Sequence, residues 1–175
     1  MCIRDRLTPA TEIAAPAPPA EQPLLQFSLA AIVVGNWLWL EELPGIPLAR
    51  EQVQLIQAMT AVLSFEAEPT RSGAAEPGAA RPQQAQFNWP IHTNQQLDLG
   101  PEAARSAVAG FIRRKLEQHK CRGLILLGRA CLDRVPCDHL DCSEVVQTVS
   151  TAEMLENASL KKQAWLDLRP LVTRV

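Results

Sequence analysis

The sequence lacks three features that would point to particular classes of protein. It has no excess of positive charge, since its formal net charge is -2 and its isoelectric point is about 5.9, so no overall field draws it to nucleic acid or to an anionic membrane. It has no long apolar run, because the longest one, Leu29–Val34, is far below the roughly 20 residues that cross a bilayer. No secretory signal is visible either, so we expect a cytoplasmic protein, not a membrane protein, whose five cysteines are free thiols.

The length and composition of the chain indicate one globular domain plus a flexible segment. The chain has 175 residues, of which 47% are hydrophobic and 21% charged, and this suits a single domain with an apolar core. We interpret Met1–Arg6 as translated adaptor sequence, and the Ala- and Pro-rich stretch Thr8–Pro23 predicts a disordered linker. Residues 1–23 are therefore set apart from a domain at 24–175, in which residues 66–86 are expected to form a flexible loop.

Strand and helix patterns alternate through this domain. Two segments rich in β-forming residues flank the turn pair Gly35-Asn36, which predicts a hairpin of Phe27–Val34 with Trp37–Leu43. The apolar run Gly123–Leu127 is typical of a strand that is buried on both faces of a parallel sheet. Further strands are expected at Phe87–Ile91 and Val145–Val149, and helices after Pro47, over Pro101–His119, after Arg129 and over Ser159–Leu168, where Pro170 should end the last helix. The sequence thus predicts an α/β fold, a three-layer sandwich with a mostly parallel central sheet and an N-terminal β-hairpin.

Three segments, in order along the chain, resemble the iron–sulfur uracil-DNA glycosylase family. The family's C-terminal motif, Thr-aromatic-His-Pro followed by a Leu pair, Asn-Pro, Lys and Trp-x-Asp-Leu, is matched in part by Thr148, Met154-Leu155, Asn157, Leu160-Lys161, Trp165, Asp167 and Leu168. The family's apolar strand and turn are matched by Leu127-Gly128 and Ala130, and its Gly-Glu-x-Pro-Gly loop by Glu42-Leu43-Pro44-Gly45. The resemblance implies a uracil-DNA glycosylase-like fold for residues 24–175.

The departures from that family fall on its reacting residues. The His-Pro pair, which in the family stabilises charge on the departing uracil, falls on Ser150-Thr151, and the first Gly of the loop motif falls on Glu41. Loss of one donor to a developing anion lowers a rate by roughly 100- to 1000-fold, and an anion at position 41 would repel phosphates. We therefore expect no catalytic residues at Glu41, Glu42, Pro44, Gly45, Ser150 and Thr151, with a water-activating role for Glu42 as the alternative.

The cysteines do not fit the iron–sulfur cluster of that family. A cluster needs four thiolates, and only Cys2 precedes Cys121 in the chain. Three cysteines and a histidine could instead make a tetrahedral zinc site, and the weak candidates are Cys131, Cys137, His139 and Cys142. Because their spacing is not that of zinc knuckles, and because free cysteine is often a small buried residue, we expect no metal and no cofactor.

A second resemblance is to the psi subunit of bacterial DNA polymerase III, a small α/β protein related in fold to the glycosylases but without their chemistry. It rests on the flexible N-terminal arm, on a strand followed by a Leu-Pro turn and a helix, and on a closing helix with Leu160, Lys161, Ala164, Trp165 and Leu168. The resemblance implies protein–protein contacts with clamp-loader and chi-like replication subunits. It also implies that any contact with DNA is indirect or weak.

Two groups of side chains have alternative interpretations. Trp37, Trp39 and Trp89 could form a partner-binding patch, because tryptophan is enriched at interface hot spots. In the alternative, which we favour, Trp37 and Trp39 share one strand face over the core, as their spacing of two allows. The basic cluster could contact phosphates or could be a solvated helix end, which we also favour; it consists of Arg113, Arg114, Lys115, Lys120 and Arg122.

Three functional hypotheses follow from the sequence. The first is a non-catalytic replication accessory protein that resembles psi. The second is a divergent uracil-DNA glycosylase of DNA repair, in which Glu42 and Asn88 orient water and read the base. The third is a small zinc-binding regulator.

Overall fold

The computed structural model describes residues 25–67, 82–92, 98–140, 142 and 144–172. The proposed adaptor residues, the proposed linker and residues 68–81 of the expected internal loop lie outside the described residues. The ends of that loop are described and are regular structure, since residues 66–67 belong to a helix and residues 83–86 to a strand. The predicted bounds of the loop, 66–86, are therefore too wide.

The centre of the molecule is a five-stranded mixed sheet in the order β3-β1-β2-β4-β5. Its strands are β1 (Phe27–Val34), β2 (Trp37–Leu43), β3 (Gln83–Trp89), β4 (Gly123–Leu127) and β5 (Glu144–Thr148). β1 pairs antiparallel with β2 and with β3, whereas β4 pairs parallel with β2 and with β5. The predicted hairpin is confirmed, and Gly35 in its turn has a φ of 57°, which glycine adopts without a steric penalty.

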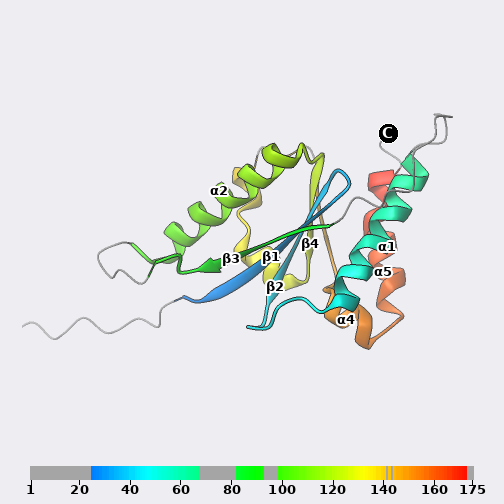
Figure 1. Ribbon diagram of the computed structural model, residues 1–175, viewed down its shortest axis with the longest axis horizontal. Helices are drawn as coiled ribbons and strands as arrows, with labels where there is room; N and C mark the ends of the chain where they lie inside the picture. The colour runs from blue at the N-terminus through cyan, green and yellow to red at the C-terminus, as the bar shows by residue number, and fades with distance from the viewer. Residues whose placement is uncertain (1–24, 68–81, 93–97, 141, 143, 173–175) are drawn as a thin grey trace, which may run out of the picture.

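Helices cover both faces of this sheet, which gives three layers (Figure 1). The α-helices are α1 (Arg50–Ala67), α2 (Pro101–His119), α3 (Arg129–Arg134), α4 (Thr151–Glu156) and α5 (Leu160–Val172), and a 3-10 turn, η1, spans Cys137–His139. α2 and α3 pack on one face, while α1, α4 and α5 pack on the other. None of the helices in the described part of the chain is both long enough and apolar enough to cross a membrane.

The alternation of side chains along the strands explains the two cores. Successive side chains of a strand point to opposite faces, so Leu38 and Leu40 of β2 lie in the core beside α2, and Trp37 and Trp39 lie in the core beside α1 and α5. All five residues of β4 are buried. The expectation that β4 is covered on both faces is therefore confirmed.

The expectation of a mostly parallel sheet is wrong, because two of the four strand pairings are antiparallel. The reason is the position of β3. It lies outside β1 at the edge of the sheet instead of beside β2, so its only neighbour among the described strands runs in the opposite direction.

Several predicted boundaries also differ from the structure. α1 begins at Arg50, three residues after Pro47, and β3 covers Gln83–Trp89 instead of Phe87–Ile91. α5 continues to Val172 with Pro170 inside its last turn. A proline holds φ near the helical value, although its missing N–H and its ring disturb the bond to the carbonyl one turn earlier. In the last turn this affects one helical bond, and α5 continues for two residues beyond Pro170.

Candidate functional site

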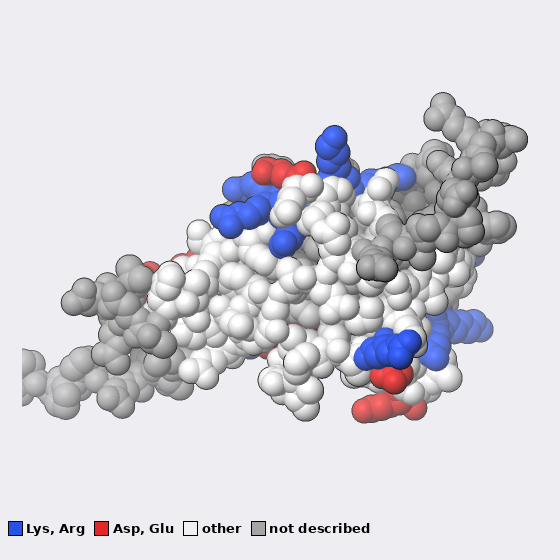
Figure 2. Space-filling model, in the orientation of Figure 1, with Lys and Arg blue, Asp and Glu red and all other residues white. Residues whose placement is uncertain are grey.

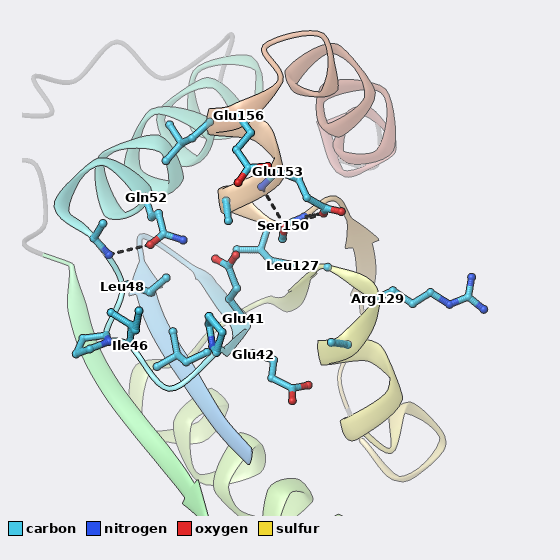
Figure 3. Close-up of a pocket in the computed structure, with 18 residues that line it drawn as sticks. Glu41, Glu42, Ile46, Leu48, Gln52, Leu127, Arg129, Ser150, Glu153 and Glu156 are labelled. Atoms are coloured by element: carbon cyan, nitrogen blue, oxygen red, sulfur yellow. Dashed lines mark hydrogen bonds between the residues drawn. The ribbon is translucent and has the colours of Figure 1, made fainter. Parts of the chain in front are cut away.

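A groove lies at the carboxyl ends of the parallel strands β2 and β4. This is where loops that follow parallel strands meet, and it is the usual place for a site in an open α/β sheet. The groove has a volume of about 810 Å³, and its walls come from the ends of β2 and β4, the loop after β2, the start of α1 and α4. Figure 3 shows Glu41 at its centre, Ile46 and Leu48 to one side, and Glu156 reaching down from α4.

The buried Glu41 side chain is bonded to the first residue of α4. Its carboxylate accepts hydrogen bonds from the Thr151 backbone N–H at 2.9 Å and from the Thr151 hydroxyl at 2.6 Å. Only 5% of Glu41 and none of Thr151 is exposed. Burial raises the pKa of the Glu41 carboxyl above its usual value, and the hydrogen bonds from Thr151 oppose this shift without cancelling it. The groups that hold this buried carboxylate are thus neutral donors.

The same network ties three elements together. The Thr151 hydroxyl accepts a hydrogen bond from Gln52 Nε2 at 2.6 Å, and Gln52 Oε1 accepts one from the Ala49 N–H at 2.8 Å. Ser150 and Glu153 form a capping box at the start of α4, in which each side chain accepts from the other residue's backbone N–H. The hydrogen bonds from Ser150 lower the pKa of the Glu153 carboxyl. The side chains of Ser150 and Thr151 therefore stabilise the start of α4 and its contacts with α1 and β2.

Glu42, the next residue of β2, belongs to the other face of the sheet. Its neighbour on β1 is Leu29, a residue of the core beside α2. The Glu42 carboxylate lies 3.4 Å from Arg134 Nε of α3, and the Arg134 guanidinium lies 5.0 Å from the centre of the Phe27 ring. With 18% of its side chain exposed, Glu42 is a partly buried ion-pair partner.

The structure does not bring Glu42 and Asn88 together. Asn88 Oδ1 accepts hydrogen bonds from the Ser28 hydroxyl at 2.9 Å and from Gln86 Nε2 at 2.8 Å. Ser28 is paired with Asn88 on one side and with Leu43 on the other, so these three side chains share one face of the sheet. Glu42 precedes Leu43 and points to the opposite face. The two residues cannot act on one base in this arrangement, which argues against the prediction that they cooperate.

The three segments that carry the glycosylase resemblance meet around the groove. The loop of Pro44 and Gly45 follows β2, and the turn of Leu127-Gly128 follows β4. Gly128 has a φ of 80°, and a Cβ atom there would lie 3.1 Å from the Cβ of Ser150. Only glycine allows this approach at that backbone angle, so position 128 lets the end of β4 lie against the start of α4.

Asp167, from the Trp-x-Asp-Leu pattern, anchors α5 to the end of β5. Its carboxylate accepts hydrogen bonds from the buried Thr148 hydroxyl at 2.9 Å and from Gln163 Nε2 at 2.8 Å. In the same helix Ala164 and Leu168 are buried in the core beside α1, whereas Trp165 is only partly buried. The Trp-x-Asp-Leu pattern thus positions α5, and Trp165, Asp167 and Leu168 do not line the groove.

The cysteines that were candidates for zinc do not share a site. Among the described side chains, which do not include that of His139, no group of three or more histidines, cysteines and acidic residues is placed to hold a metal. Cys131, in α3, is fully buried, and burial raises the pKa of its thiol to about 12.

The three tryptophans do not form the exposed patch that was one of their two interpretations. Trp37 and Trp39 are 7% and 0% exposed and lie in the core beside α1, whereas Trp89 is 7% exposed and lies in the core beside α2. Because the two sets occupy opposite faces of the sheet, they cannot contact one partner. The alternative interpretation, a location in the core, is confirmed.

The basic cluster has exposed members and members that contact other side chains. Arg113 and Arg114 are exposed on α2, and blue side chains gather over that helix in Figure 2. Lys115 lies 6.0 Å from the centre of the Phe111 ring, and Arg122 pairs with Glu144 at 3.1 Å. The favoured interpretation, a solvated helix end, and its alternative, contact with phosphates, both stay hypotheses.

The sequence analysis missed the helix α4 and the contact that holds it. The signal for the helix was present, because Ser150 and Glu153 have the Ser-x-x-Glu spacing of a capping box. The contact between Glu41 and Thr151 joins residues that are 110 positions apart. No local pattern signals such a contact.

Comparison with known proteins gives no match: no family model, no curated protein and no solved structure matches this chain.

Proposed function

We propose that this protein is a non-catalytic accessory protein of DNA replication that resembles the psi subunit of bacterial DNA polymerase III. It acts through protein–protein contacts with clamp-loader and chi-like subunits. The observation that carries the proposal is the pair of hydrogen bonds between Glu41, which lines the groove, and the fully buried Thr151. Both residues stand at positions where the resemblance predicts reacting or substrate-contacting groups, and here they satisfy each other.

This contact removes what a glycosylase would need in the groove. A glycosylase must stabilise the departing uracil anion with a donor that is free to face it. The N–H and hydroxyl of Thr151 already donate to Glu41, and the Ser150 hydroxyl bonds to the Glu153 carboxylate at 2.6 Å. The donors at positions 150 and 151 are thus directed at carboxylates of the protein itself.

The charge of the groove also opposes entry of DNA. The lining side chains include Glu41, Glu42, Glu153 and Glu156 but a single cation, Arg129. In Figure 3 the Arg129 side chain extends away from the groove. Phosphate groups would therefore approach several carboxylates, of which Glu42 is paired with Arg134. This excess of negative charge favours a protein partner over a nucleic acid.

Uracil release from a uracil-containing single-stranded oligonucleotide tests the absence of catalysis. We expect the purified chain to release no more uracil than a buffer control, in parallel with an active glycosylase that establishes the sensitivity of the assay. Clear excision that is abolished by Glu42→Ala would overturn the proposal in favour of a divergent glycosylase, since Glu42 was the alternative candidate for activating water.

The proposed partners require a separate binding experiment. We expect the chain, immobilised and titrated with purified chi and with the purified clamp-loader complex, to bind at least one of them with saturable affinity. An unrelated acidic protein of similar size serves as the control. Absence of binding to both would contradict the assignment to replication while leaving the absence of catalysis in place.

A further inference from the structure

The groove at the ends of β2 and β4 combines exposed aliphatic side chains with an acidic rim. Ile46, in the loop after β2, is 69% exposed, and Leu155, on α4, is 44% exposed. Both line the groove together with Pro44, Pro47 and Leu48. Large apolar side chains that gather around a concavity, as distinct from single exposed ones, are typical of an interaction surface.

The floor of the groove does not suit a small ligand. Small-molecule sites usually place a few free polar groups at fixed positions in an apolar pocket. Here Glu41, the buried polar group that lines the groove, is already bonded to the fully buried Thr151. What remains for a ligand is aliphatic surface with carboxylates around it, which is the apolar centre and polar rim of a protein interface.

The sign of the charge on this rim selects the partner. Glu156 reaches over the groove from α4 and Glu153 lies one turn before it (Figure 3), while Arg129, the lone cation of the lining, points outward. A carboxylate next to an apolar surface favours a lysine or arginine that accompanies an apolar side chain. An acidic segment would meet like charge at the same place.

We propose that this groove binds a segment of a partner protein in which an apolar anchor residue is flanked by lysine or arginine. The inference rests on the proposed function, because it assigns the protein–protein contact to a particular surface. The apolar anchor lies against Ile46 and Leu155, and the basic residue pairs with Glu156 at the rim.

Selection from a random peptide library tests this assignment and does not require that the partner be identified first. The full chain is immobilised, a phage library of random 12-residue peptides is selected on it, and the enriched peptides are synthesised with a fluorescent label. We expect a consensus of an apolar residue next to lysine or arginine. Fluorescence anisotropy should show that Ile46→Asp and Glu156→Lys each weaken binding by about tenfold or more, as expected for hot-spot contacts.

The matched control is Val62→Asp, which places the same charge on a side chain that is 43% exposed on α1 and does not line this groove. Binding by this variant should stay within about twofold of that of the unmodified chain, which is below the 1.4 kcal/mol that corresponds to a tenfold change. Ile46→Ser serves as a second variant if Ile46→Asp alters the circular dichroism spectrum. Enrichment of acidic peptides, the absence of a consensus, or binding that Ile46→Asp leaves unchanged would overturn the proposal.

Two further outcomes separate this inference from other occupants and from the proposed function. Dimerisation of the full chain that Ile46→Asp abolishes, seen by sedimentation velocity, would assign the groove to a second copy and overturn the proposal. Uracil excision by a chain that still selects basic and apolar peptides would overturn the proposed function alone. A lack of uracil excision together with a lack of peptide consensus would overturn the docking groove alone.

Discussion

Two neighbouring glutamates at the end of β2 lie on opposite faces of the sheet and have different partners. On the α4 side, Glu41 is 5% exposed and is bonded to the neutral N–H and hydroxyl of Thr151. On the α3 side, Glu42 keeps 18% of its side chain exposed and pairs with the cation Arg134 at 3.4 Å. Two adjacent glutamates thus differ in burial and in the type of partner, because a strand directs successive side chains to opposite faces of the sheet.

The difference shows that a carboxylate in a groove need not be a catalytic group. A buried carboxylate that binds a substrate or a water would have lone pairs directed at open space. Glu41 instead uses its oxygens to fix the start of α4, and its pKa is raised by burial. We therefore expect the protein to lose more stability when Glu41, on the α4 side, is removed than when Glu42, on the α3 side, is removed.

The largest effect should come from Glu41→Ala. The substitution leaves the Thr151 N–H and hydroxyl buried without their acceptor, and each unpaired buried group costs about 1–3 kcal/mol. We expect the free energy of unfolding to fall by about 2–4 kcal/mol, measured by urea denaturation followed by circular dichroism. A loss below about 1 kcal/mol, the size of an ordinary hydrogen bond, would show that Glu41 does not hold α4.

Removal of the hydroxyl from the other side of the contact should have a somewhat smaller effect. Thr151→Val keeps the shape of the side chain but takes partners from both Glu41 and Gln52. We expect a loss of about 1–3 kcal/mol in the same denaturation experiment. Thr151→Ser retains the hydroxyl and is the matched control; equal losses for the two variants would assign the effect to packing of the methyl group.

The pH dependence of stability should distinguish Glu41 from its Gln variant. Because the pKa of Glu41 is raised in the folded protein, the stability gained on its protonation is fully present below the unfolded value of 4.5 and is lost as the pH rises through the folded pKa. The stability of the unmodified chain relative to Glu41→Gln should therefore fall as the pH rises above 4.5. A relative stability that rises with pH would mean that the Thr151 donors outweigh burial.

Glu153 provides the opposite case for this pH experiment. Its pKa is lowered by the hydrogen bonds from Ser150, so its contribution is present above 4.5 and is lost as the pH falls through the folded pKa. The stability of the unmodified chain relative to Glu153→Gln should consequently fall toward low pH. The same trend for both variants would contradict the structural difference between the two carboxylates.

The smallest effect should come from Glu42→Ala on the α3 side. Its ion pair with Arg134 is partly exposed, and pairs of this kind contribute about 0.2–1 kcal/mol and are screened by salt. We expect the loss of stability to shrink when sodium chloride is raised to about 1 M, where the screening length is about 3 Å. The loss caused by Glu41→Ala should be nearly independent of salt, because no cation among the described residues pairs with Glu41. A strong dependence there would contradict this contact with neutral donors.

The elements that could be predicted from the sequence are those with a local signal. The turn pair Gly35-Asn36 marks the hairpin, and the unbroken apolar run Gly123–Leu127 marks the strand buried on both faces. The position of β3 beside β1 was not predictable, because strand order depends on contacts between distant segments. That placement adds a second antiparallel pairing to that of the hairpin, which is why the sheet is not mostly parallel.

In the candidate site, too, some features have a local signal in the sequence and others depend on the fold. The resemblance singled out Glu41 and Thr151 separately, as departures from a motif, but only the fold shows that they meet. The exposure of Ile46 and Leu155 was also hidden in the sequence, because whether an apolar side chain is covered depends on which helices pack above it. Only the capping box of Ser150 and Glu153 was a local signal that could have been used.

The most direct test of the account is a double-mutant cycle between Glu41 and Thr151. The free energies of unfolding of the unmodified chain, Glu41→Ala, Thr151→Val and the double variant are measured under one condition. If the two residues hold each other, the double variant should lose less than the sum of the single losses, by about 1 kcal/mol or more. Additive losses would contradict the claim that Glu41 and Thr151 stabilise the protein by bonding to each other.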